Sequence, residues 1–183
     1  MIIGASGARS SRTADLERKL VHHCSPALAG LKPANMFVYR EGADAGENPD
    51  GSAALGALDS TKFAHELGIC RKKLEPCGVR IEILARRKTG LLLYVYRPTM
   101  LREYLAQPEV FRYLQDEGYD PSDLSACIAK LHRRICGTDL AATLSGSCAF
   151  PHEIGFFLGY PYDDVVGFIE NKGENSLCSG CWK

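Results

Sequence analysis

The sequence lacks the long apolar run that a membrane-spanning helix requires. No stretch approaches the ~20 consecutive apolar residues that cross a bilayer, so no membrane span is expected. The first residues also lack a charged n-region followed by a long apolar segment, which argues against a secretory signal. We therefore expect a cytoplasmic protein, in which the eight cysteines remain thiols rather than forming disulfides.

An excess of charge of either sign is also lacking. The 22 Lys and Arg residues balance the 22 Asp and Glu residues, whereas domains that bind nucleic acid usually carry a basic excess. We expect neither a nucleic-acid nor a membrane partner. No glycine-rich nucleotide-binding motif is present, because the segment 4–7 has no lysine at the position that a P-loop requires.

The composition fits one folded domain. The chain has 183 residues, of which 45% are hydrophobic, enough to bury a sizeable core. We interpret residues 1–12 as a loose leader and 13–183 as a single domain. Within it, residues 41–59 are rich in Gly, Ala and Asp without a hydrophobic period, which predicts a long surface loop.

Hydrophobic periodicity predicts the fold class. Residues 79–84 alternate apolar and polar side chains, and residues 91–96 are apolar throughout, which indicates two strands joined by a hairpin. Residues 36–40 are a third strand candidate. Helices are expected over 13–23, 60–74, 99–106, 108–117, 122–136, 151–158 and from 161 onward. The expected architecture is α+β, with a small antiparallel sheet of about three strands packed against a mostly helical layer.

Three segments carry a resemblance to a known family. They are residues 23–35 (HCSPALAGLKPAN), residues 94–97 (YVYR) and residues 150–173, and they are followed by Trp182-Lys183. From about residue 16 to its end, the chain resembles an uncharacterised bacterial family, the domain of unknown function 3793. The resemblance implies a source among anaerobic bacteria and relatives that continue past Lys183 with another helix, but it implies no activity. Cys181 stands where the family has an aromatic residue, and Cys148 lies outside the family pattern.

One group of residues predicts a thiol–imidazole site. Cys24 precedes Pro26 and is expected at the start of a new helical turn, where the helix dipole lowers a thiol pKa. His152 would act as the base, with Glu153 or Asn171 orienting its ring, because an activated nucleophile needs both a base and an orienting group. The hypothesis is a small thiol-dependent enzyme with an acyl or peptide-like substrate. The alternative is that Cys24 and His152 are structural.

A second group suggests a metal centre or redox site. Cys178 and Cys181 have the C-x2-C spacing of a zinc knuckle, and Cys148 and His152 could complete a tetrahedral set. Zinc or iron is therefore a possible cofactor under this alternative.

A third group could bind an anion. Lys32, Asn35, Arg71 and Arg97 could surround a phosphate or carboxylate of a small-molecule ligand, since arginine offers a planar fork to two oxygens. The alternative is ordinary surface charge.

A fourth hypothesis is a non-catalytic interaction module. In it the corner formed by residues 160–164 would contact a partner protein, whose identity the sequence leaves open.

Overall fold

A computed structural model describes residues 10–41, 59–87, 90–138 and 151–171. The chain divides into two compact units, Met1–Arg97 and Pro98–Lys183. The expectation of a single domain over 13–183 stays a prediction. None of the helices in the described ranges combines the length and apolar character that crossing a bilayer requires.

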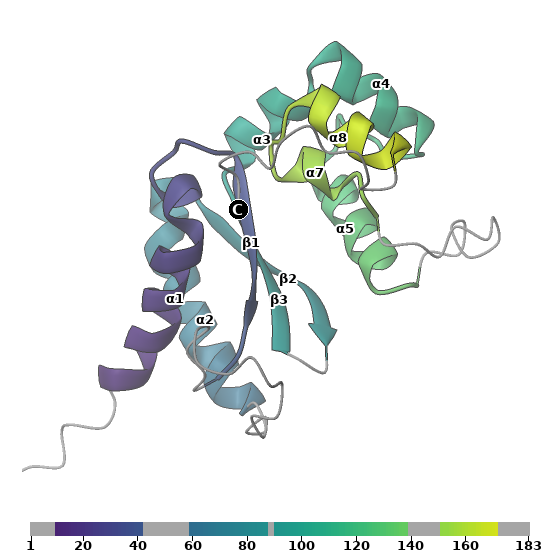
Figure 1. The fold of residues 1–183 in the computed structure, drawn as a ribbon. Coiled ribbons are helices and arrows are strands. Elements are labelled where there is room, and N and C mark those ends of the chain that lie inside the picture. The colour runs from purple at the N-terminus through teal and green to yellow at the C-terminus, as the bar shows by residue number, and fades with distance from the viewer. Residues whose placement is uncertain (1–9, 42–58, 88–89, 139–150, 172–183) are drawn as a thin grey trace, which may run out of the picture. The chain divides into compact units, whose positions relative to one another are not determined.

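The N-terminal unit is a three-stranded antiparallel sheet with helices against it (Figure 1). Its elements are α1 (Ser10–Leu28), β1 (Ala34–Tyr39), α2 (Ser60–Leu74), the 3-10 turn η1 (Glu75–Cys77), β2 (Arg80–Arg87) and β3 (Gly90–Tyr96). The strand order is β1-β3-β2. The apolar run therefore forms the central strand, as its lack of alternation predicted, and the α+β class is confirmed.

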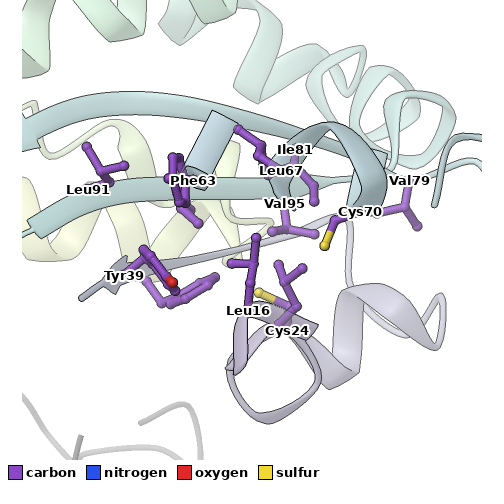
Figure 2. Close-up of a cluster of buried hydrophobic side chains, with 13 residues drawn as sticks. Leu16, Cys24, Tyr39, Phe63, Leu67, Cys70, Val79, Ile81, Leu91 and Val95 are labelled. Carbon is purple, nitrogen blue, oxygen red and sulfur yellow. The ribbon is translucent and has the colours of Figure 1, made fainter. Parts of the chain in front are cut away.

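One face of the sheet and both helices enclose a single core. The register sets Phe37 opposite Leu93 and Ile81 opposite Val95, so these side chains share a face. Figure 2 shows Ile81 and Val95 in one cluster with Leu16 of α1 and Leu67 of α2. The cluster comprises Leu16, Leu20, Cys24, Phe37, Tyr39, Phe63, Leu67, Cys70, Val79, Ile81, Leu91, Leu93 and Val95.

Two local predictions in this unit have opposite outcomes. Asp59 caps α2, because its carboxylate accepts hydrogen bonds from the N–H groups of Thr61 and Lys62 at 3.1 Å each. Such a cap favours a helix start at the next residue, and the helix predicted over residues 60–74 is confirmed. The predicted end of the first helix at residue 23 is wrong, because α1 runs on through Pro26 to Leu28.

The C-terminal unit is helical in the residues described. It contains α3 (Pro98–Leu105), α4 (Pro108–Asp116), α5 (Leu124–Ile135), α7 (Ile154–Phe157) and α8 (Tyr162–Glu170). Its buried side chains include Leu114, Leu131, Phe156 and Phe157. The last two helices meet at a tight corner, where a Cβ on Gly155 would lie 2.7 Å from Val165 Cγ2. A side chain at that position would push the two helices apart.

Candidate functional site

Cys24 lies on the core-facing side of α1. Its side chain is 0% exposed, and desolvation raises the pKa of the thiol to about 12. The expectation of a lowered pKa is wrong. No new helical turn begins at Cys24, so no N-terminal dipole favours the thiolate there.

Pro26 is accommodated inside α1 by a side chain from β1. Proline has no N–H and its ring clashes with the carbonyl four residues earlier, which disturbs the helical hydrogen bonds around it. The N–H of Ala27 donates to Asn35 Oδ1 at 3.1 Å, and the Ser25 hydroxyl donates to the carbonyl of Val21. Asn35 was predicted to bind an anion, but its amide oxygen is occupied by the backbone of α1.

Arg97 holds three backbone carbonyl groups at the end of the N-terminal unit. Nε donates to the carbonyl of Ala27 at 2.6 Å, Nη2 to that of Leu28 at 2.5 Å and Nη1 to that of Cys77 at 3.1 Å. The carbonyls at a helix C-terminus lack intrahelical donors, and a cationic side chain there satisfies them. The Arg97 guanidinium therefore closes the ends of α1 and η1, and its predicted role in anion binding stays a prediction.

The other two residues of the predicted anion site have separate environments. Arg71 donates from Nε to the carbonyl of Ile81 at 2.8 Å and forms an ion pair with Glu82 at 3.1 Å. Lys32 is nearly buried, and desolvation lowers its pKa. A surface hollow of about 200 Å³ is lined by Arg71, Glu75, Val79, Arg80, Ile81 and Glu82. The lining includes two arginines and two glutamates, whose formal charges cancel, and the anion site stays a prediction.

Glu153 is the centre of a buried polar network in the C-terminal unit. Its carboxylate accepts a hydrogen bond from the Tyr119 hydroxyl at 2.8 Å and pairs with Arg134 Nη1 at 2.7 Å. Arg134 also pairs with Glu117 at 2.9 Å. Burial and the Glu153 carboxylate raise the pKa of Tyr119, which keeps its hydroxyl protonated as a donor. The Glu153 carboxylate is thus engaged by Tyr119 and Arg134, and its predicted role in orienting His152 stays a prediction.

His152 and Asn171 lie along the outer side of α8. The His152 ring is exposed and packs on Phe168, with ring centroids 5.2 Å apart. Asn171 donates from Nδ2 to the carbonyl of Gly167 at 2.7 Å, which closes the last turn of the helix. Cys24 belongs to the N-terminal unit, and His152 and Asn171 belong to the C-terminal unit. The proposed catalytic set as a whole stays a prediction.

Residues 164, 167, 168 and 171 fall at i, i+3, i+4 and i+7, so they form one stripe of α8. We call Asp164, Gly167, Phe168 and Asn171, together with His152, the α8 face. Phe168 is 51% exposed, and a Cβ placed on Gly167 would meet no atom within 4 Å. The face therefore combines an apolar ring with an open stretch of backbone.

Most of the candidate ligands of the predicted metal centre lie outside the described residues. Cys148, Cys178 and Cys181 lie there, and only His152 of that set is described. Across the described ranges, no group of three or more His, Cys, Asp or Glu side chains could hold a metal ion. The metal hypothesis stays a prediction.

Sequence reasoning missed a thiol–imidazole pair on α5. Cys136 Sγ lies 3.9 Å from His132 Nε2, and both side chains are exposed. The signal was present, because a four-residue spacing on a predicted helix places two side chains on one face. Arg134 was also missed, because its partners Glu117 and Glu153 are distant from it in sequence.

The chain matches the model of a known protein family. A family model described as "Protein of unknown function (DUF3793)" matches residues 20–183. A search of the curated proteins and a search of the solved structures found no match.

Proposed function

The chain belongs to the DUF3793 family of proteins of unknown function, and on that premise we propose that it is a protein-interaction module that docks a partner on the α8 face. The observation that carries the proposal is Gly167. Glycine inside a helix costs roughly 1 kcal/mol relative to alanine, and the space around Gly167 would admit a side chain. Packing within the described structure gives no reason for glycine there, whereas close approach of a partner does.

The neighbouring side chains supply an apolar anchor. A single exposed hydrophobic residue is ordinary on a protein surface, so Phe168 alone would carry little weight. Here the ring stands next to the open backbone of Gly167 and against the His152 ring. Aromatic side chains at the centre of an interface commonly contribute much of the binding energy.

The charges on α8 define the partner. The sequence of α8 is YDDVVGFIE, in which Asp164 lies on the α8 face, Asp163 and Glu170 lie beside that face, and no residue is basic. All three carboxylates are on exposed residues. A partner segment with an apolar side chain flanked by Lys or Arg would complement this surface, as in an amphipathic helix laid along a helix face.

A thiol-dependent enzyme receives less support from the described residues. Its nucleophile would be Cys24, whose thiol is buried with a pKa raised to about 12. Its orienting groups, Glu153 and Asn171, are engaged by Tyr119, Arg134 and the backbone of α8.

The test is site-specific photocrosslinking in the native host. A photoreactive phenylalanine analogue replaces Phe168, and a matched control carries the analogue at Glu103, an exposed position on α3. We expect a discrete adduct with another protein from position 168 and none from position 103. Adding Gly167→Leu, or Asp163→Arg with Asp164→Arg, should abolish the adduct.

The Gly167→Leu variant separates binding from folding. Leucine is a better helix former than glycine, so thermal unfolding should show equal or greater stability than in the parent chain. An adduct that persists in both variants would contradict the proposal. An adduct only with a second copy of the chain would also contradict it, because the proposed partner is a different, basic protein.

A further inference from the structure

The last turn of α5 holds an imidazole and a thiol together. Cys136 Sγ and His132 Nε2 are 3.9 Å apart, and both residues are exposed. Neither residue belongs to the α8 face or to the Glu153 network. The pair therefore raises a chemical question separate from the proposed docking function.

The separation fits the two ligand atoms of one metal ion. A zinc ion bound at ~2.3 Å from sulfur and ~2.0 Å from nitrogen, with tetrahedral angles, sets its ligand atoms about 3.5 Å apart. The observed 3.9 Å needs only a small rotation of either side chain to match. Thiolate and imidazole are also ligands that select Zn²⁺ over Mg²⁺ or Ca²⁺.

The electrostatic surroundings of the pair partly favour a cation. The aligned peptide dipoles of a helix give its C-terminal end a partial negative charge, which stabilises positive charge nearby. Arg133 and Arg134 follow His132 directly and oppose a cation. The charge of Arg134 is compensated by Glu117 at 2.9 Å and Glu153 at 2.7 Å.

We propose that His132 and Cys136 form a two-ligand site for Zn²⁺ at the C-terminal end of α5. Binding replaces the thiol proton of Cys136 with the metal and releases that proton to solvent, without oxidation or reduction. Imidazole Nε2 donates its lone pair to the ion. The two remaining tetrahedral positions are filled by water or by further side chains.

The experiment titrates the full chain with Co²⁺, a coloured substitute for Zn²⁺, and follows the thiolate-to-metal charge-transfer absorption. We expect the band to appear, to be displaced by Zn²⁺, and to be lost in Cys136→Ser. In His132→Ala the Co²⁺ affinity should fall. The matched control is Cys77→Ser, since Cys77 is exposed but follows Lys73 at the same spacing; this variant should keep the band.

Three results would contradict the proposed zinc site. They are a band that survives Cys136→Ser, an affinity unchanged by His132→Ala, and a band lost equally in Cys77→Ser. Circular dichroism of each variant checks folding. Because the substituted residues are exposed, the spectrum should match that of the parent chain.

Discussion

Cys24, Cys70 and Cys127 are buried, and desolvation is the main cause that raises the pKa of each thiol, to about 12 for Cys24 and about 11 for the other two. A cysteine reacts as its thiolate and must also be reached by the reagent. Both conditions fail for these three residues near neutral pH. Cys77 and Cys136, by contrast, are exposed.

This difference predicts the order of alkylation by iodoacetamide at pH 7.5. Cys77 and Cys136 should be modified first, and Cys24, Cys70 and Cys127 should react only when the chain is unfolded in urea. Peptide mass spectrometry after timed quenching measures each site. Rapid modification of Cys24 in the folded chain would contradict its burial and would revive the thiol-enzyme hypothesis.

At the scale of elements, α1 depends on two residues outside the helix. Asn35 of β1 accepts the hydrogen bond of the Ala27 N–H, and Arg97 after β3 binds the carbonyls of Ala27 and Leu28. The helix therefore passes Pro26 because the sheet supplies the missing partners. Tertiary contacts outweigh the local preference of proline to end a helix.

We expect Asn35→Ala to lower the free energy of unfolding by about 1–3 kcal/mol, because it leaves a part-buried N–H without an acceptor. In a Pro26→Ala background, Asn35→Ala should lower the free energy of unfolding by less. There the unbroken helix offers the Ala27 N–H the carbonyl of His23 as an acceptor. Urea unfolding of the four chains of this double-mutant cycle measures the coupling. Equal costs in both backgrounds would show that Asn35 does not compensate for proline.

The elements predicted correctly were those marked by a pattern of residues close together in the sequence. Residues 91–96 were predicted as a strand from their unbroken apolar run, and a helix was predicted over residues 60–74, the bounds of α2. The end of α1 was missed because its partners, Asn35 and Arg97, are distant in sequence. The Glu153–Arg134 pair was missed for the same reason: it joins positions 19 residues apart through the fold, and neither periodicity nor spacing reports such a contact.

Across the molecule, cysteine thiols and tyrosine hydroxyls with raised pKa values occur in both units. Burial is the first cause for each of Cys24, Cys70, Cys127, Tyr39, Tyr94, Tyr104, Tyr113 and Tyr119. The folded chain therefore holds protons that the unfolded chain releases. Their contribution to stability is fully present below the unfolded pKa values, ~8.5 for Cys and ~10 for Tyr, and is lost as the pH rises toward the folded values.

The chain should accordingly lose stability on the alkaline side. We expect the free energy of unfolding to fall from about pH 9 upward, with a slope of up to about 1.4 kcal/mol per pH unit for each thiol that titrates only on unfolding. Urea unfolding at several values between pH 8 and 11 measures the slope. Cys24→Ala should reduce the slope, and a flat profile in the parent chain would contradict the raised pKa values.

Arg97 also has a mechanical consequence. It is the last residue of the N-terminal unit, its N–H donates to the carbonyl of Pro33 at 2.8 Å, and its side chain binds carbonyls of α1 and η1. A pulling force applied along the chain from Pro98 would thus reach α1, η1 and the turn before β1 at once. Such a load is shared in parallel among several hydrogen bonds, and the unit would resist extension at this end until they break together.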